Sequence, residues 1–300
     1  MVDLKHLNPE TQAVALLPSM ERLAHLNVER WIGYTRANQI LAQLESFFTN
    51  EPRKLRPQNL LIVSPSNNGK TMIAEKFVKL HPQRNSDDGN NEIIPVLKVQ
   101  MPPEATNNRF YTALLTALGT PVGFFGHHNM RETLSLQLMR TVGVRMLIID
   151  EVHNLLDATP RRQREMLNLL RYIGNDLRIP IVCLGIREAY LAIRSDDQLE
   201  NRFHPVLLPL WESGLELARL LASFETILPL GEPSQLSAKP LSEQVLRRSE
   251  GTIGEIFALL TSATTTALMQ GEERITSDII DNTDYNPPSV RRRIVERELR

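Results

Sequence analysis

The feature of this chain that most constrains its fold is a polar turn between an apolar run and a helix-like stretch. The turn reads Ser64-Pro-Ser-Asn-Asn-Gly-Lys-Thr71, between the apolar run 59–63 and the stretch 72–80. This is the context of a P-loop, whose backbone N–H groups surround a β-phosphate while its lysine reaches the β- and γ-oxygens. Its Ser/Thr hydroxyl binds Mg²⁺, and the helix N-terminus adds the positive end of a dipole. The pattern predicts an NTPase.

One position departs from the P-loop pattern Gly-x-x-x-x-Gly-Lys-Ser/Thr. Ser64 occupies the place of the first glycine, which serves for a tight backbone turn. Serine is small enough for the interpretation to stand; the alternative is a strand-to-helix turn with an incidental lysine. The predicted nucleotide contacts from this segment are Ser64, Ser66, Asn67, Asn68, Gly69, Lys70, Thr71 and Met72.

About eighty residues further on, a second apolar run, 145–149, ends in Asp150-Glu151. Such a continuous run is typical of a strand buried on both faces of a parallel sheet. We expect Asp150, with Thr71, to hold a hydrated Mg²⁺, because this ion needs few protein oxygens. Glu151 would polarise the attacking water, and Lys70 would supply charge to the loose transition state of phosphoryl transfer.

Composition favours a globular enzyme. The 300 residues, 42% hydrophobic and 23% charged, suffice for one sizeable α/β domain and a smaller companion. No apolar stretch approaches the roughly 18 residues of a membrane span, and the N-terminus lacks a signal peptide's apolar core, so we expect a cytoplasmic protein. Cys183, the single cysteine, lies in an apolar segment and is expected to be a buried structural thiol. The histidines show no metal-ligand spacing, and His127-His128 is expected in a solvated loop.

The formal net charge of −1 means that any nucleic-acid contact must come from a local patch. The C-terminal segment offers one candidate. It carries Arg291, Arg292, Arg293, Arg297 and Arg300, with Glu296 and Glu298 interleaved. Both a DNA-binding arm and a solvated or partner-binding tail fit this pattern.

A coarse pass along the chain predicts a parallel sheet, because short apolar strands alternate with helical segments. The expected strands are Leu60–Val63, Pro95–Val99, Met146–Ile149, Ile181–Leu184 and Val206–Leu208. Thr159-Pro160 is typical of a helix start, and the segment 83–91 of a polar surface loop. After residue 211 only helices are expected, two of them opened by capping boxes at Ser213–Glu216 and Thr252–Glu255.

The chain therefore divides into four predicted parts. They are an N-terminal helical extension (1–29), an α/β nucleotide-binding domain (30–211), a small helical lid (212–283) and a basic tail (284–300).

This order of motifs resembles the AAA+ ATPases, which implies a five-stranded parallel sheet flanked by helices, plus a small C-terminal helical lid. The segment Asp197-Gln-Leu-Glu-Asn-Arg-Phe203 is similar to the AAA+ segment whose arginine reaches the γ-phosphate of the neighbouring subunit. Arg202 is therefore the candidate arginine finger, which would require an oligomer. The alternative is a surface arginine paired with Asp197 or Glu200.

At two positions this chain lacks the residue type that is usual in AAA+ ATPases. The end of the fourth strand, where a polar sensor residue is usual, reads Cys183-Leu-Gly-Ile-Arg187. Arg187 is a weak candidate sensor. The lid helix that often carries a sensor arginine begins near Glu255, which fits the N3 position of a capping box better. Loss of that arginine favours slow hydrolysis and a nucleotide-gated switch over a fast motor.

Within AAA+, the chain most resembles the TniB/TnsC-type transposition ATPases over residues 30–260. The specific elements are Arg30-Trp-Ile-Gly-Tyr-Thr-Arg-Ala37, Ser66-Asn-Asn-Gly-Lys-Thr71, Ile148-Ile-Asp-Glu-Val-His-Asn154 and Asp197–Phe203. The resemblance implies that Trp31 and Arg36 border the adenine, and that ATP with Mg²⁺ drives assembly into rings or helical filaments, hexameric per turn, around double-stranded DNA. It also implies recruitment of a DDE transposase and a TniQ-like adaptor, with hydrolysis dismantling the filament. Trp31 and Tyr34 have an alternative interpretation as ordinary packing residues.

Contacts of such a filament with arbitrary DNA should go to phosphates rather than bases. The candidates follow the second strand and its turns: Lys98, Arg109, Thr120 and Arg131. Each has an alternative interpretation as an ordinary surface residue.

Two other functions stay open at this point. A helicase-loader or initiator-type AAA+ ATPase would share nearly all of this chemistry. A nucleotide-gated scaffold that neither hydrolyses ATP nor touches DNA is the other, although the intact Glu151 argues against it.

Overall fold

The computed structural model describes residues 3–26, 28, 30–87, 89, 92–120, 128–194 and 200–299. The chain forms two compact units. One comprises Met1–Thr35 together with Leu210–Arg300, and the other Arg36–Pro209. The domain boundaries at residues 30, 212 and 284 stay predictions.

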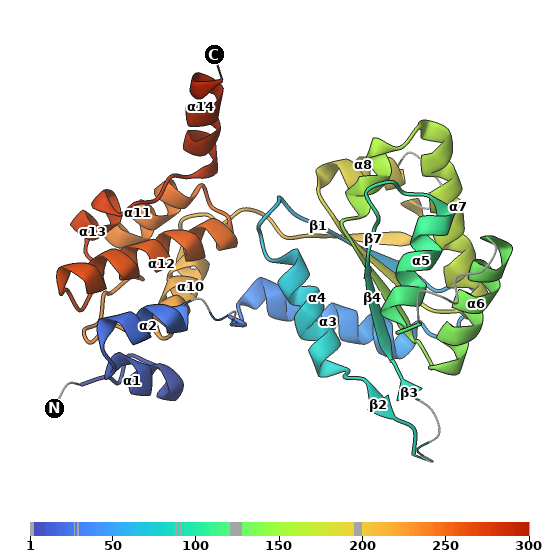
Figure 1. Ribbon diagram of the computed structural model, residues 1–300, viewed down its shortest axis with the longest axis horizontal. Coiled ribbons are helices and arrows are strands. Elements are labelled where there is room, and N and C mark those ends of the chain that lie inside the picture. The colour runs from blue at the N-terminus through green and yellow to red at the C-terminus, as the bar shows by residue number, and fades with distance from the viewer. Residues whose placement is uncertain are drawn as a thin grey trace. The chain divides into compact units, whose positions relative to one another are not determined.

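A five-stranded sheet forms the centre of the unit 36–209 (Figure 1). Its strands are β1 (Asn59–Val63), β4 (Val96–Gln100), β5 (Met146–Asp150), β6 (Ile181–Gly185) and β7 (Phe203–Leu207). Their spatial order is β4-β5-β6-β1-β7, and every neighbouring pair is parallel. The carboxyl ends of all five strands therefore lie at one edge, where ligands bind in open α/β sheets. The predicted five-stranded parallel sheet is confirmed.

Helices cover both faces of this sheet. The elements are α3 (Thr35–Asn50), α4 (Lys70–Leu80), α5 (Asn107–Ala117), α6 (His128–Thr141), the 3₁₀ helix η2 (Val152–Asp157), α7 (Pro160–Leu177) and α8 (Arg187–Arg194). Helices α3 and α4 lie on one side, and α5, α6 and α7 on the other (Figure 1). Strands β1, β5 and β6 are buried at every position, as expected between two helical layers. Cys183 lies in this core as a buried free thiol, as predicted.

Two segments differ from the sequence prediction. The fifth strand begins at Phe203, three residues before the predicted start, and its burial alternates irregularly. It is an edge strand that includes Pro205, so the continuous apolar run of a central strand is not required there. The predicted polar loop 83–91 contains part of a short antiparallel hairpin, in which β2 (Arg84–Asn85) pairs with β3 (Glu92–Ile93). Both strands are only two residues long, and Ile93 is their one apolar residue, so they carry no recognisable apolar pattern.

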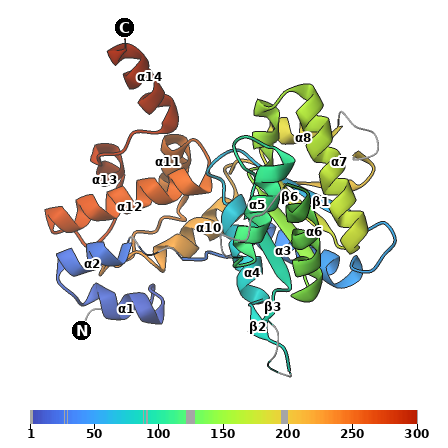
Figure 2. The same cartoon turned by 45° about the vertical axis from the view of Figure 1, so that its right-hand side comes forward.

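The other unit is helical. It contains α1 (Pro9–Ala15), α2 (Ser19–Leu26), α10 (Leu215–Glu225), α11 (Lys239–Ser249), α12 (Ile253–Gln270), α13 (Ser277–Asn282) and α14 (Pro288–Glu298). Helix α12 lies between α2 on one side and α11 and α13 on the other (Figure 2). No single helix in the described ranges is long and apolar enough to span a membrane. Helices α11 and α12 taken together have the length and composition of a span, but the pair is bent by 112°.

The two predicted capping boxes have different outcomes. The Thr252 hydroxyl accepts the N–H of Glu255 at 3.4 Å, as predicted for the start of α12. At α10 the prediction is wrong, because Gly214 is the N-cap and caps without a side chain. The carboxylate of Glu216 is engaged by Thr35 and Arg219 instead.

The Glu255 carboxylate ties the C-terminal segment to α12. It accepts hydrogen bonds from the Tyr285 hydroxyl at 2.8 Å and from the Arg291 guanidinium at 2.6 Å, although Glu255 itself is only 7% exposed. Helix α14 has no buried residue, so this charged contact is a main attachment of the tail helix.

Candidate nucleotide-binding site

The P-loop connects the end of β1 to the start of α4, at the carboxyl edge of the sheet. Asn67 and Gly69 adopt left-handed backbone conformations, with φ of 57° and 88°. Gly69 is the N-cap of α4 and has no side chain to obstruct the exposed N–H groups of the first turn. Ser64, in the place of the usual first glycine, has no positive φ. Its N–H donates to Gly185 O at 3.1 Å, so a serine fits there without backbone strain.

Lys70 begins α4, and its side chain folds back over the loop. The ammonium donates to Ser64 O at 3.1 Å and to Pro65 O at 2.9 Å, and the residue is only 5% exposed. Burial lowers the pKa of Lys70, while the nearby Glu151 and Asp150 carboxylates oppose this shift. A buried cation at the start of a helix is suited to bind a polyphosphate.

Thr71 and Asp150 meet although 79 positions separate them in the chain. The Thr71 hydroxyl donates to Asp150 Oδ2 at 2.8 Å, which places two oxygen ligands side by side. Lys98, on β4, forms an ion pair with Glu75, and its Nζ lies 3.9 Å from Asp150 Oδ2. One hydroxyl and one carboxylate fit Mg²⁺, which usually keeps several of its waters.

Glu151 follows Asp150 in a left-handed conformation, with φ of 55° and ψ of 38°. Its N–H donates to Asp150 Oδ1 at 2.9 Å. Its carboxylate Oε2 lies 3.1 Å from His153 Nε2, at the start of η2. Such a conformation costs about 1 kcal/mol in a residue other than glycine. This strained turn therefore places Glu151 directly after the end of β5, next to the Asp150 that is hydrogen-bonded to Thr71.

Asn68 links the P-loop to the end of β7. The side-chain amide donates to Leu208 O at 3.0 Å and to Pro209 O at 2.8 Å, and Asn68 is only 1% exposed. Leu208 N in turn donates to Val63 O at 2.9 Å, just before the loop. Asn68 therefore has a structural role in the fold of the loop, whatever contact it makes with a nucleotide.

Of the remaining predicted residues of the ATP site, two belong to the P-loop and the helix that follows it, and two come from other segments. Met72 is half-buried in the first turn of α4, and Ser66 is exposed in the loop. Arg36 donates from Nε to Leu207 O at 2.9 Å. Trp31 belongs to the helical unit, where Tyr34 packs edge-on against Trp211 with ring centroids 5.0 Å apart. Contact of Trp31 and Arg36 with adenine stays a prediction.

Arg202 lies immediately before β7. It donates from Nη1 to Asn175 Oδ1 at 2.8 Å, and among the described residues no carboxylate lies within ion-pair distance of it. Burial lowers the Arg202 pKa, and so does the positive charge of Arg56 and Arg171. Glu200 pairs with Arg194 instead, at 3.5 Å, and Asp197 lies outside the described residues.

Three predicted DNA contacts lie away from the P-loop. Arg109 on α5 pairs with Glu104 at 2.9 Å, and Arg131 on α6 donates to the Thr112 hydroxyl at 3.3 Å. Thr120 lies just after α5 and is half-buried. Together with Lys98, whose ammonium lies beside Glu75 and Asp150, these contacts stay predictions.

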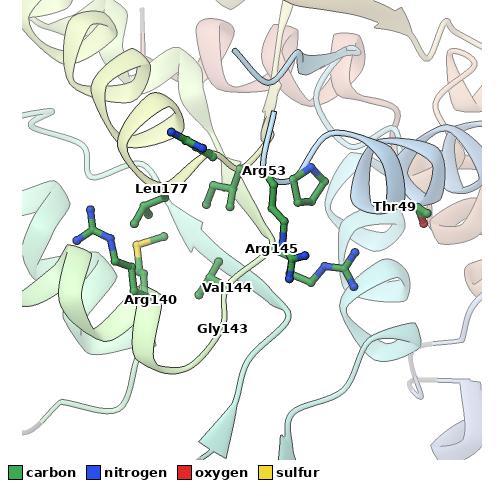
Figure 3. A pocket seen from close by; sticks show the side chains of 11 residues that line it. Thr49, Arg53, Arg140, Gly143, Val144, Arg145 and Leu177 are labelled. Atoms are coloured by element: carbon green, nitrogen blue, oxygen red, sulfur yellow. The ribbon is translucent and has the colours of Figure 1, made fainter. Parts of the chain in front are cut away.

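A concavity lies at the opposite edge of the sheet from the P-loop, beside the amino ends of β5 and β6 (Figure 3). It has a volume of about 700 Å³, and arginine side chains line much of it: Arg53, Arg140, Arg145 and Arg178. Arg140 is paired with Asp176, and the Arg145 guanidinium lies 4.5 Å from the centre of the Phe48 ring. None of the predicted nucleotide or DNA contacts lines this pocket.

Strand order, P-loop and acid-ended β5 together define an AAA+ P-loop NTPase fold. The chain belongs to the TniB family: the family model described as Bacterial TniB protein matches residues 22–213. No curated protein matches the chain.

Solved structures with this fold include proteins of archaea. The Aeropyrum pernix ORC1 protein in complex with DNA is 19% identical, with a TM-score of 0.63 over 91% of this chain and 69% of that one. The Aeropyrum pernix ORC2 protein, in ADPNP–ADP complexes, is 14% identical, with a TM-score of 0.62 over 85% and 69%. A Walker-type ATPase of Pyrococcus abyssi is 14% identical, with a TM-score of 0.58 over 92% and 78%.

Sequence reasoning missed two features of the site. It assigned Asn68 to nucleotide contact only, and it gave no role to His153, although His153 lies within the acidic motif. The signal for His153 was its position two residues after Glu151. In the structure the two side chains meet across a left-handed conformation at Glu151, which no sequence pattern specifies.

We predict that Asn68→Ala lowers the free energy of unfolding by about 2 kcal/mol, because the carbonyl groups of buried Leu208 and exposed Pro209 lose their donor. The measurement is urea unfolding followed by circular dichroism, where the midpoint should fall without a change in slope. Asn67→Gly is the matched control, since Asn67 is exposed and glycine readily adopts its positive φ. Equal midpoints for Asn68→Ala and wild type would show that the two hydrogen bonds do not stabilise the loop.

Proposed function

We propose that this protein is an ATP-dependent, DNA-binding AAA+ regulator of transposition that acts in the cytoplasm. In this proposal it binds ATP with Mg²⁺, oligomerises on double-stranded DNA without sequence preference, and recruits a DDE transposase and a TniQ-like adaptor. Hydrolysis to ADP and phosphate then drives disassembly. Membership of the TniB family supports the link to transposition.

The observation that carries the proposal is the convergence of four side chains at the carboxyl edge of the sheet. Lys70 lies in the P-loop, Thr71 and Asp150 are hydrogen-bonded to each other, and Glu151 follows directly. Lys70 would bind the β- and γ-phosphates, and Thr71 and Asp150 would hold Mg²⁺ with its waters. Glu151 would orient the water that attacks the γ-phosphate. The same fold with bound ADPNP and ADP in the Aeropyrum pernix ORC2 protein supports nucleotide binding.

DNA binding is supported by the likeness in fold to the Aeropyrum pernix ORC1 protein, whose structure is a complex with DNA. Since the net charge is −1, contacts must be local and directed to phosphates. Arg109, Thr120 and Arg131 follow β4 in the chain, and we propose them, with Lys98, as contacts.

Oligomerisation is supported by the surroundings of Arg202. An arginine close to Arg56 and Arg171 adds to local positive charge rather than neutralising a carboxylate. Such a group favours an incoming anion, and the γ-phosphate bound by a neighbouring subunit would be that anion. We propose that Arg202 acts in trans as an arginine finger.

Assembly should require bound triphosphate. We expect rings or filaments on sequence-unrelated duplex DNA with ATP or a non-hydrolysable analogue, and none with ADP, when the mixtures are imaged by electron microscopy. Lys70→Ala should abolish assembly because the phosphates lose their buried cation. Glu151→Gln should keep assembly and lose ATP turnover. No DNA association in any nucleotide state would refute the DNA-binding part of the proposal.

A finger in trans predicts complementation between two inactive variants. Arg202→Ala retains its own Glu151, and Glu151→Gln retains Arg202, so mixed assemblies contain interfaces with both groups intact. ATP turnover of the mixture should exceed that of either variant alone. Arg161→Ala, at an exposed arginine of α7, is the control and should retain wild-type turnover. A mixture no more active than its components would place Arg202 outside the neighbouring site.

Phosphate contacts predict a specific salt dependence. Arg109→Ala and Arg131→Ala should each weaken binding equally on unrelated sequences and flatten the plot of log K against log salt by about one unit. Fluorescence anisotropy with non-hydrolysable ATP measures both quantities, again with Arg161→Ala as control. An unchanged slope would exclude the substituted arginine as a contact.

A further inference from the structure

Within the acidic motif 148–154, the side chain of His153 forms an ion-pair contact with the proposed catalytic carboxylate: its Nε2 lies 3.1 Å from Glu151 Oε2. Both side chains are partly shielded, with exposures of 23% for His153 and 36% for Glu151. No other hydrogen bond or ion pair to the Glu151 carboxylate occurs within the described ranges of the chain. The imidazole is therefore the described group in direct polar contact with this carboxylate.

The position of His153 is fixed by the backbone around it. Val152 is 1% exposed and packs against Gly185 at the end of β6, where an added Cβ would lie 2.9 Å from Val152 Cγ1. Asn154 anchors the other side, since its amide donates to Met101 O at 2.8 Å. His153 is thus held between two anchored residues, while Glu151 is held in its left-handed turn. The contact belongs to a pre-organised segment rather than to two mobile side chains.

The contact with Glu151 also indicates which nitrogen of the ring is placed to carry the proton. A carboxylate only accepts, so His153 Nε2, at 3.1 Å from Glu151 Oε2, is the ring nitrogen placed to carry the proton. His153 Nδ1 is buried and has no hydrogen-bond partner among the described residues. The ring therefore presents a single useful donor, and that donor faces Glu151.

We propose that His153 is a positioning residue for ATP hydrolysis. By donating to Oε2 it fixes the Glu151 side chain and leaves Oε1 to accept a proton of the attacking water. The water oxygen bonds to the γ-phosphorus as the bond from that phosphorus to the β,γ-bridging oxygen breaks. ADP keeps the electron pair, and the water proton passes to the released phosphate by way of Glu151. This inference rests on the proposed ATPase function and assigns a role in it that the P-loop and the acidic pair leave open.

The test is a kinetic comparison of the full-length protein with DNA and Mg-ATP. His153→Ala removes the donor, and kcat should fall about 10- to 100-fold, as for other groups that orient a reacting side chain. The dissociation constant for ATP should change less than about twofold, because no phosphate contact is lost. His153→Gln restores an N–H close to the position of Nε2 and should recover much of the rate. His153→Asn, whose amide reaches only the position of Nδ1, should not.

A double-substitution cycle separates positioning from a structural effect. In a Glu151→Gln background, His153→Ala should cause no further loss of residual turnover, because the carboxylate it orients is already gone. The inference is overturned by unchanged or increased kcat in His153→Ala, by equal losses in both backgrounds, or by a matching loss of ATP affinity. If the wild-type protein hydrolysed ATP no faster than Glu151→Gln, that result would instead overturn the proposed ATPase function, and the role of His153 with it.

Discussion

The hydrogen bond from Thr71 to Asp150 is the contact on which the rest of the site depends. It joins the first turn of α4 to the end of β5, although β6 separates β5 from the strand that leads into the P-loop. Three parallel strands in register are needed to bring the two side chains within 2.8 Å of each other. The buried core of β1, β5 and β6 therefore supports the site directly, since a shift of any of these strands would separate the two oxygens that we propose as Mg²⁺ ligands.

Local strain is concentrated at the same edge. Asn67 and Glu151 both adopt left-handed conformations, and each costs about 1 kcal/mol relative to a residue in an ordinary region. Such conformations persist only where the surrounding structure determines them. Buried Asn68 fixes the loop on one side, and the close packing of Val152 on Gly185 fixes the acidic turn on the other. The stability of the sheet and its helices offsets this strain.

The parts of the fold that sequence could predict are those in which one local pattern determines the structure. Central strands carry unbroken apolar runs, and the P-loop has an established spacing, so β1, β5, β6 and the start of α4 were predictable. The edge strand β7 was misplaced because Pro205 and its exposed neighbours interrupt the pattern. Contacts such as Asn68 with Leu208, 140 positions apart, depend on the assembled sheet, and no local pattern encodes them. The pairing of Glu151 with His153 depends on a backbone conformation that a glutamate rarely adopts.

The distribution of charge is the feature that connects the proposed hydrolysis with the proposed assembly. Lys70 is a buried cation of the P-loop, and its low exposure makes it costly to leave without a negative partner. Asp150 and Glu151 compensate that charge in part. In the proposed reaction, the negative charge that develops on the γ-phosphate would need further cationic groups. Arg202, surrounded by Arg56 and Arg171, is repelled by its own neighbours and stabilised by any anion brought to it. If a second subunit supplies that anion as its bound nucleotide, each subunit completes the site of the next, and hydrolysis can occur only where subunits are assembled.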